Sequence, residues 1–395
     1  MTRAVVTGLG AVTPVGTGIP AFLEALRTGR RGLVSRPRWM EGDWRSQVAA
    51  DVVPFPEEPA GLDPAARLAV VAGMQAIADA GLGLEGDARW RAGLTLGTCL
   101  GGLASLERFV AGEEDPELLL RYPPAAITQA VAETLGLYGE SRTLTTACAA
   151  GTDAIGEALG FIRDGRCDVV VAGGTDPLCL LPSAGFNALE ALDPEGCRPF
   201  DRQRDGASLG EGAAVLVLEA EAHARARGAR VYAEVLGYGA VNDAYHTVAP
   251  DPTGDGAWRA MTAALADAGL PATALVYVNA HGTGTRANDE MEVDALRRLL
   301  GRHRIPVSST KSQVGHGLGA SGSIEAVACC LAIATGVLPP TCGLGDPIVP
   351  DMDFATPPGR TLPPGPVLSN SFAFAGHMAS LVLGPYQGEP PAQCT

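Results

Sequence analysis

Short apolar stretches rich in β-branched residues alternate with alanine-rich stretches along the whole chain, and this alternation constrains the fold more than any other feature. Apolar runs of strand length predict β-strands, and patterns with a 3.6-residue period predict helices. The expected strands occupy residues 3–9, 91–98, 142–146, 167–174, 212–220, 230–241, 275–282, 305–310, 366–372 and 379–385. The expected helices occupy residues 21–29, 64–81, 124–136, 151–165, 254–269, 288–301 and 322–336. Strands that alternate with helices predict an α/β protein with parallel strand pairs.

The beginning of the chain is echoed in its second half. RAVVTGLGAVTP at residues 3–14 resembles RVYAEVLGYGAVND at residues 230–243, and an alanine-rich helix ending in AG and another strand follow each. Repeated segments of this kind indicate duplicated units. We therefore expect two related halves, residues 1–229 and 230–395, packed as one compact unit with a seam near residues 220–232.

Composition narrows the class of protein. The net charge is −15 and no run of lysine and arginine is present, so we expect no nucleic acid as a partner. No run reaches about 18 apolar residues, so neither a membrane span nor a signal peptide is expected. The nine cysteines form no C-x-x-C pair, which indicates reduced thiols in a cytoplasmic protein. A dinucleotide-binding turn needs a third glycine three residues after the second, but Thr13 occupies that position after Gly8 and Gly10. We therefore do not expect a nicotinamide or flavin site.

Two segments carry candidate catalytic side chains directly after predicted strands. In TLTTACAAGTDAIGEAL, Cys148 precedes a predicted helix, where the helix dipole lowers a thiol pKa and free N–H groups can bind an oxyanion. A buried, inert cysteine is the alternative, and it is what we expect for Cys329 and Cys330 inside an apolar helix. In LVYVNAHGTGT, His281 ends a strand where ligands gather in α/β proteins, although a structural histidine fits equally well.

The chain contains a single lysine, Lys311, in the segment VSSTKSQVGHGLGASGSIE. We expect Lys311 to end a strand, His316 to follow in a glycine-rich turn, and Glu325 to lie in the first turns of the next helix. A buried lysine requires a carboxylate or carbonyl partner, and Glu325 can supply one. The alternative is a solvated lysine in a plain loop.

A last turn, in LSNSFAFAGHMASLVLG, lies between two predicted strands and carries Phe372, Phe374 and His377. An aromatic side chain between small residues can swing over a pocket as a gate, and the alternative is a hydrophobic plug.

At these segments the sequence resembles the β-ketoacyl-acyl carrier protein synthases of type II and the related polyketide ketosynthases. The resemblance extends from VVTGLGAVTPVG through TACAAG, DVVVAGGTD, RPFDRQRDGASLGEGAAVLVLE and YVNAHGTGT to SSTKSQVGHGLGASG and NSFAFAG. It implies a duplicated thiolase fold with five layers, αβαβα, a dimer as the working unit, and decarboxylative condensation of an acyl thioester with malonyl-acyl carrier protein. It implies neither a metal nor an organic cofactor.

The resemblance also implies roles for individual residues. Cys148 would accept the acyl group, and His281 and His316 would bind the malonyl thioester carbonyl. Lys311 and Glu325 would support them. Phe374 would be the gate, and its N–H would form an oxyanion hole with that of Cys148.

The gate departs from the family pattern, because Ala373, Ala375 and His377 replace the usual Gly, Gly and Thr. Alanines restrict a loop more than glycines do, so we expect a stiffer gate. We expect Phe372, Ala375 and His377 to line the site, with a local hydrogen-bonding role for His377.

The partners follow from the same resemblance. We expect acyl and malonyl carrier proteins, with Arg67 and Arg198 on the docking surface, and a homodimer or a heterodimer with a chain-length-factor homologue. Fatty-acid and specialised polyketide or polyene pathways both stay open. The alternatives are a non-elongating acyltransferase or decarboxylase on the same fold, and a chain-length-factor-like partner subunit.

Overall fold

The computed structural model describes residues 2–35, 44–357 and 359–388, and most of its strands form one large mixed sheet. Cys394 lies outside these ranges, and the eight described cysteines have free thiols. The sheet order is β13-β11-β10-β15-β16-β9-β1-β8-β7-β5-β6, with β2 paired to β1. The N-terminal strands are β1 (Ala4–Thr13), β2 (Gly16–Thr17), β5 (Ala92–Gly97), β6 (Ser141–Leu144), β7 (Val169–Asp176) and β8 (Gly212–Ala220). The C-terminal strands are β9 (Ala233–Asn242), β10 (Tyr277–Asn279), β11 (Pro306–Ser308), β13 (Asp353–Phe354), β15 (Val367–Phe372) and β16 (His377–Gly384).

The strand order is the same in both parts of the sheet. The N-terminal order β1-β8-β7-β5-β6 matches the C-terminal order β9-β16-β15-β10-β11 strand for strand. In the N-terminal part, neighbouring strands of β1-β8-β7 are antiparallel and those of β7-β5-β6 are parallel. In the C-terminal part, those of β9-β16-β15 are antiparallel and those of β15-β10-β11 are parallel. The antiparallel register Ala4 to Val235 through Val6 to Ala233 joins β1 to β9. The fold is therefore duplicated, as the sequence predicted.

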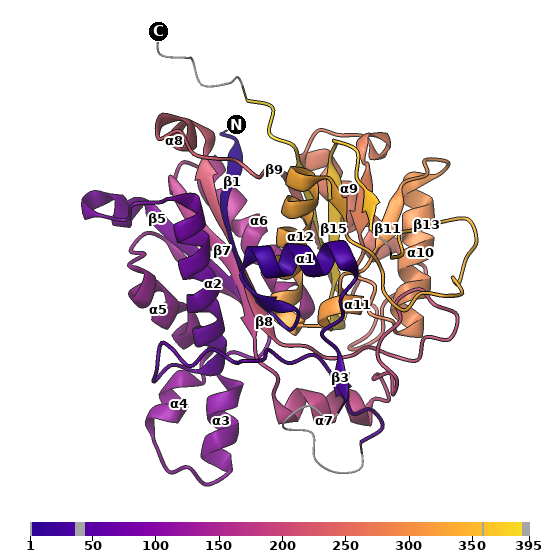
Figure 1. Cartoon of the computed structure of the whole chain (residues 1–395), viewed down its shortest axis with the longest axis horizontal. Helices are drawn as coiled ribbons and strands as arrows, with labels where there is room; N and C mark the ends of the chain where they lie inside the picture. The colour runs from indigo at the N-terminus through magenta and orange to yellow at the C-terminus, as the bar shows by residue number, and fades with distance from the viewer. Residues whose placement is uncertain (1, 36–43, 358, 389–395) are drawn as a thin grey trace.

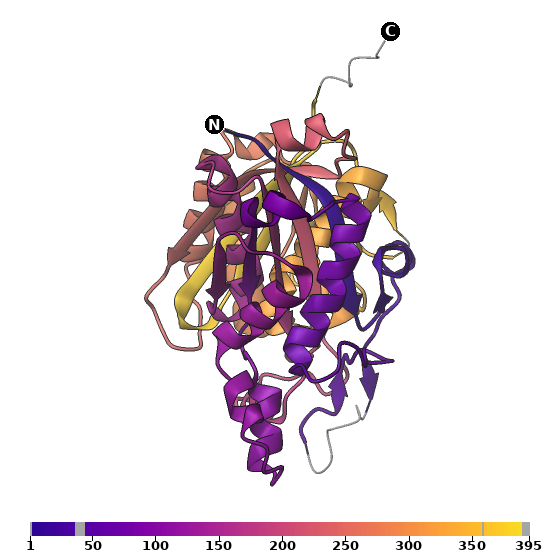
Figure 2. The ribbon, with the colours of Figure 1, turned by 90° about the vertical axis from the view of Figure 1, so that its left-hand side faces the viewer.

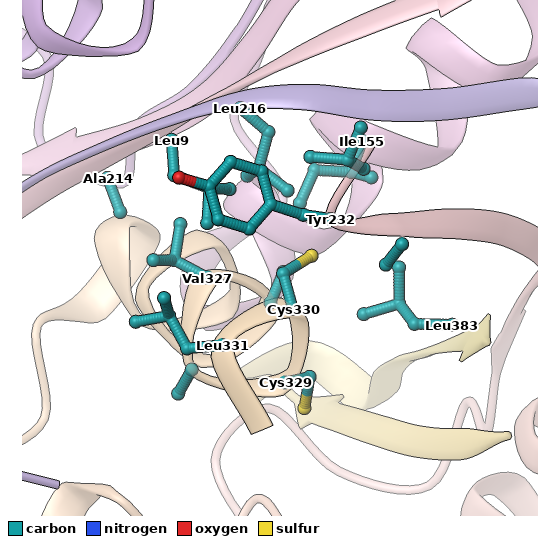
Figure 3. Close-up of a cluster of buried hydrophobic side chains, with 14 of the residues drawn as sticks. Leu9, Ile155, Ala214, Leu216, Tyr232, Val327, Cys329, Cys330, Leu331 and Leu383 are labelled. Carbon is teal, nitrogen blue, oxygen red and sulfur yellow. The ribbon is translucent and has the colours of Figure 1, made fainter. Parts of the chain in front are cut away.

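Helices form the remaining three layers of an αβαβα arrangement (Figure 1). The central layer is α6 (Ala150–Arg163) and α12 (Ser321–Thr335), which contact strands of both parts of the sheet. The outer layers are α2 (Pro64–Ala80) with α5 (Pro124–Leu135), and α9 (Asp255–Asp267) with α10 (Arg286–Leu300). Figure 3 shows Val327, Cys330 and Leu331 of α12 packed toward Leu9 and Leu216 of the N-terminal strands.

The remaining elements are short. Figure 2 shows α3 and α4 extending away from the layers. The other helices are α1 (Ile19–Thr28), α3 (Leu103–Val110), α4 (Glu117–Arg121), α7 (Leu180–Ala188), α8 (Glu221–Ala226) and α11 (Lys311–Val314). The 3-10 turns are η1 (Gly86–Arg91), η2 (Ala147–Ala149), η3 (Ala272–Ala274), η4 (Leu318–Ala320) and η5 (Phe374–Gly376). Two small antiparallel sheets pair β3 (Val34–Ser35) with β4 (Val48–Ala49), and β12 (Val337–Leu338) with β14 (Arg360–Thr361).

Gly8 and Gly10 allow α2 to lie directly on β1. A Cβ atom on Gly8 would stand 2.1 Å from the Ala76 carbonyl oxygen, and one on Gly10 would stand 1.9 Å from that of Ala72. Both distances are far inside van der Waals contact, so only glycine fits. The GLG motif thus serves helix-to-strand packing.

The segment Leu318–Thr335, which includes α12, is long and apolar enough to cross a membrane, with a mean hydropathy of 1.6 over 18 residues. The sequence predicted an apolar helix here, over residues 322–336, and no membrane span. Within the fold 83% of it is buried, because α12 is the core helix between the two parts of the sheet. Burial between the two parts of the sheet explains an apolar helix without a membrane.

Candidate active site

Cys148 lies in the tight turn between β6 and α6. The chain leaves β6 at Leu144 and forms η2, in which Ala147 has a φ of 50°. A non-glycine residue in this left-handed region is strained and is held there by its surroundings. The turn presents Cys148 two residues before α6 begins at Ala150, which is the position that the sequence predicted.

The thiol pKa of Cys148 is raised, so the expected lowering is wrong. Burial raises the pKa to about 11, although the Lys311 ammonium acts in the opposite direction. The Asp176 carboxylate adds to the rise, and hydrogen bonds from the backbone N–H groups of Phe374 and Cys148 lower the pKa. Loss of solvent therefore outweighs the charges and N–H groups at this helix end. The Cys148 thiol is protonated at neutral pH.

A buried carboxylate on α10 holds the loop that carries His281. The backbone N–H groups of His281 and Gly282 each donate to Glu292 at 2.8 Å, and the Asn370 side-chain amide donates to it at 3.2 Å. Burial raises the pKa of Glu292 to about 7, against these hydrogen bonds. The loop after β10 is thereby tied to α10 and β15.

Lys311 is buried behind His281 and contacts two side chains. Its ammonium donates to Glu325 and lies 3.2 Å from His281 Nδ1. An ammonium has only donors, so Nδ1 of His281 must accept, and the proton of the neutral ring sits on Nε2. Burial raises the pKa of Glu325 to about 7, although Lys311 opposes the rise. The sequence predicted this contact, but Lys311 begins the short helix α11, and β11 ends earlier at Ser308.

His316 lies across from His281 in the turn between α11 and η4. Its Nδ1 is 2.9 Å from the Ser321 hydroxyl, and its backbone bonds to Ser208 and Gly210. The two imidazole rings are 5.5 Å apart and nearly perpendicular, at 86°. Burial, followed by the Lys311 charge, holds the pKa of both histidines well below 6.5. Both rings are therefore neutral at neutral pH.

Cys148, His281 and His316 open onto one cavity of about 220 Å³. Lys311 and Glu325 lie behind its wall. The cavity is lined by Cys148, Phe186, Leu189, Ala191, Ala207, Val248, Ala249, Pro250, His281, Thr283, Thr285, Ala287, Asn288, His316, Phe372, Ala373, Phe374 and Met378. The wall is mostly apolar with a few convergent polar groups, which is the usual form of a site for an organic ligand.

Phe374 stands at the cavity with its ring stacked on Phe186 of α7, at 5.4 Å between centroids and 18° between planes. Phe372 also lines the cavity, as expected. Ala375 and His377, which were expected beside it, are not among the residues that line this cavity. Ala375 has a φ of 62° and donates its N–H to the Thr247 carbonyl, and His377 turns to Asp153.

Arg67 and Arg198 do not line the cavity, and both have partners within the chain. Arg67 donates to the carbonyls of Pro56 and Leu62. Arg198 pairs with Asp193 and Glu195. The two carboxylates neutralise part of the charge that Arg198 would offer to a docking partner, whereas the carbonyls hold the Arg67 side chain in place without neutralising its charge.

Sequence reasoning missed the groups that hold the site together. Glu292 positions the His281 loop, Ser321 contacts His316, and Phe186 stacks on Phe374. Asp176 accepts from Thr98, Cys99, Leu100 and Gly319. The sequence gives one signal for each of the two carboxylates. Asp176 is an acidic residue in an otherwise apolar strand, and Glu292 is an acidic residue on the buried face of a helix.

Two family profiles match most of the chain. The profile described as "Beta-ketoacyl synthase, N-terminal domain" matches residues 1–224. The profile described as "Beta-ketoacyl synthase, C-terminal domain" matches residues 232–345.

Similar proteins match over nearly their whole length. The chain is 40% identical to a "Putative polyketide beta-ketoacyl synthase 1" of Streptomyces cyaneus, covering 97% of this chain and 98% of that one. It is also 40% identical to a "3-oxoacyl-[acyl-carrier-protein] synthase 2" of Synechocystis, covering 98% of each. The solved structure of "The ishigamide ketosynthase/chain length factor" matches with a TM-score of 0.92 at 36% identity, over 98% of this chain and 99% of that one.

Proposed function

Because the chain belongs to the β-ketoacyl synthase family, we propose that it joins an acyl thioester to malonyl-acyl carrier protein by decarboxylative Claisen condensation. The observation that carries this proposal is that Cys148 and two neutral imidazoles, His281 and His316, open onto one cavity. Cys148 can hold the acyl chain as a thioester, while His281 and His316 bind the carbonyl of the malonyl thioester beside it.

Acylation is the first step. The Cys148 sulfur attacks the carbonyl carbon of the acyl thioester, the thiol proton passes to the departing carrier thiol, and the old carbon–sulfur bond breaks. The N–H groups of Phe374 and Cys148 converge on this sulfur, so the carbonyl oxygen that becomes an oxyanion forms next to them. Donors fixed in advance stabilise that charge at little cost in reorganisation.

Condensation follows at the same carbonyl. Loss of CO2 from the malonyl group leaves an enolate, whose carbon attacks the Cys148 thioester; the carbon–sulfur bond breaks, and the Cys148 thiolate takes up a proton from water. The Nε2–H of His281, fixed by Lys311 at Nδ1, can donate a hydrogen bond to the enolate oxygen while keeping its proton. If the Ser321 hydroxyl donates to Nδ1 of His316, the proton of that neutral ring sits on Nε2, and His316 can also donate a hydrogen bond from Nε2. Neutral donors match a charge that develops only in the transition state.

The alternatives are a chain-length-factor-like subunit and a non-elongating acyltransferase or decarboxylase on the same fold. The printed titles of two similar structures name a ketosynthase with its chain length factor. The presence of Cys148, His281, His316 and Lys311 together favours the catalytic subunit. It also favours condensation over acyl transfer alone, because acyl transfer to a thiol needs no pair of imidazoles.

The partners are proposed on the same footing. Acyl and malonyl carrier proteins supply the substrates, and one similar structure is described as an acyl-carrier protein in complex with its ketosynthase. The titles of two similar structures name a ketosynthase with a chain length factor, which supports a heterodimer with such a homologue. A homodimer is the other assembly that we propose. We keep Arg67 and Arg198 as candidate docking residues and place the protein in the cytoplasm. The pathway is that of fatty acids or of specialised polyketides or polyenes.

We also propose that the chain divides into halves at residues 229 and 230. The repeated strand order and the short connection from α8 to β9 support this division.

The test is mass spectrometry of the protein after incubation with acyl-carrier protein, followed by malonyl-carrier protein. An acyl group on Cys148 and a β-ketoacyl product are expected. Cys148→Ala should lose the acyl adduct, and Cys329→Ala is the matched control. An acyl adduct without any β-ketoacyl product would overturn condensation and favour the acyltransferase alternative.

A further inference from the structure

The carboxylate of Asp153 joins the two segments that carry the backbone donors facing Cys148. Asp153 lies in the first turn of α6 and is 5% exposed. It accepts hydrogen bonds from the Thr146 hydroxyl, from the Tyr238 hydroxyl at 2.7 Å and from His377 Nε2 at 2.7 Å. Thr146 is two residues before Cys148, and His377 is three residues after Phe374. One buried group thus contacts both chain segments.

The contact to His377 acts on a small closed loop. The Ala373 N–H donates to the His377 carbonyl at 2.8 Å, so residues 373–377 form a loop with a fixed base, which we call the gate loop. Ala375 and Gly376 follow each other in the left-handed region, with φ of 62° and 77°. Because the bond between Ala373 and His377 closes this loop, a shift at His377 also shifts the residues between them. The position of the His377 ring therefore affects where the Phe374 N–H points.

The other contacts of the gate loop run in a different direction. The Ala375 N–H donates to the Thr247 carbonyl, the Asn242 amide donates to the Ala375 carbonyl, and the Asp243 N–H donates to the Gly376 carbonyl. These bonds attach the gate loop to residues 242–247, which follow or end β9. The bond from His377 attaches it to the helix that follows the nucleophile.

We infer that His377 is a positioning residue, which holds the Phe374 N–H in register with the Cys148 N–H through the Asp153 carboxylate. The inference rests on the proposed function, because it assumes that these two N–H groups stabilise an acyl-transfer oxyanion. Burial supports it, since a carboxylate removed from water needs strong donors to stay in place. Loss of the His377 ring removes one of the three donors to Asp153 and with it the bond that ties the gate loop to α6.

The experiment compares two reactions of the same thiol. Acyl transfer from an acyl thioester passes through an oxyanion, whereas alkylation by iodoacetamide forms none at a carbonyl. In His377→Leu we expect the acylation rate of Cys148 to fall about tenfold or more, since misplacing one donor costs part of its effect. The alkylation rate should fall much less, because burial and the Lys311 charge, which act most strongly on the Cys148 thiol pKa, remain unchanged.

Matched variants separate positioning from general damage. His377→Gln keeps a donor that can reach Asp153 and should retain most of the acylation rate. His223→Leu is the control, because His223 also pairs with a carboxylate, Glu219 at 2.6 Å, but lies on α8 away from the cavity. It should leave both reactions unchanged.

Equal acylation rates in His377→Leu and the wild type would overturn the inference, as would a parallel fall in acylation and alkylation. If His377→Leu does not fold, His377→Asn replaces it. Its amide is too short to reach Asp153, so acylation must be slower than in His377→Gln, and equal rates would refute the positioning role. A wild-type protein that no thioester acylates would instead refute the proposed function, so the two failures can be told apart.

Discussion

The ammonium of Lys311 lies 3.2 Å from Nδ1 of His281, and this pair decides which ring nitrogen of the histidine carries the proton. Glu325 binds the other side of the ammonium, and both Lys311 and Glu325 are 1% exposed. A guanidinium is planar and wider than an ammonium, so an arginine would not fit the narrow space between Glu325 and His281 that holds the compact Lys311 ammonium. This geometry gives a physical reason for lysine at this position in a chain that otherwise uses arginine.

Lys311→Arg should therefore lower condensing activity strongly, by about a hundredfold if the Nε2 proton of His281 is misplaced. The measurement is product formation in a single turnover from enzyme that already carries an acyl group. Arg225→Lys, the reverse change at an exposed position, is the control and should have no effect. Full activity in Lys311→Arg would show that a lysine is not required there.

The pH dependence of condensation should reveal neutral histidines. Burial and Lys311 keep the pKa of His281 and His316 well below 6.5, so neither ring gains a proton as the pH falls from about 8 to about 6.5. The buried carboxyls of Glu292 and Glu325, whose pKa values are raised to about 7, titrate in this range, so the single-turnover condensation rate of acylated enzyme should change only through these two groups. A decline with an apparent pKa near 6.5 that persists in both Glu292→Gln and Glu325→Gln would contradict this expectation, because it would place an ordinary imidazole at the reacting centre.

Stability should fall as the pH rises through the neutral range. Burial raises the pKa of Glu292 to about 7 from 4.5, so the folded protein keeps a proton that the unfolded chain releases. The stability from this group is present in full below pH 4.5 and is lost as the pH rises through 7. Denaturant unfolding of Glu292→Gln, compared with the wild type, should show a flatter decline. Parallel curves for the two proteins would contradict the raised pKa.

Ala375→Gly should speed acyl transfer if the gate loop limits it. Ala375 has a φ of 62°, where alanine is strained and glycine is not. Glycine should also change the free energy of unfolding by no more than about 1 kcal/mol, since relief of strain and added freedom of the unfolded chain oppose each other. Acyl-transfer rates to Cys148 check the first expectation, with Ala373→Gly for comparison. Equal rates would mean that gate flexibility does not limit the reaction.

Arg198→Glu should raise the KM for the acidic carrier protein and leave small acyl thioesters unaffected. The effect should be modest, within about tenfold, because Asp193 and Glu195 already neutralise part of the Arg198 charge. Arg67→Glu tests the other candidate in the same assay. Arg286→Glu, at an exposed side chain next to the cavity-lining residues Thr285 and Ala287, provides the comparison. A larger effect from Arg286 would move the docking surface toward α10.

Local patterns in the sequence sufficed for the strands and helices of the layered core. Apolar periodicity depends on neighbours a few positions apart, and strands such as β7 and β8 are buried along nearly their whole length. The one-turn helix at Lys311 escaped this reasoning, because four residues are too few to show a period. The short helices α3, α4, α7 and α8 were missed as well.

For the candidate site too, the sequence identified some features and left others to the tertiary structure. Cys148, His281, His316, Lys311 and Glu325 could be selected from the sequence, because they occur in short motifs that resemble those of a known family. The rise in the Cys148 pKa, the hold of Glu292 on the His281 loop and the turn of His377 toward Asp153 could not be predicted. Each depends on burial or on a contact between residues distant in the chain.

The sequence by itself thus determined the alternation of elements, the duplication and the set of reactive side chains, since these are written in local spacing and in motifs. Only the tertiary structure decided the protonation of those side chains and the direction in which they point. The physical reason is that a pKa and a hydrogen-bond direction depend on loss of solvent and on partners from other segments. Asp153 shows this directly, because it meets His377 across 224 positions of the chain.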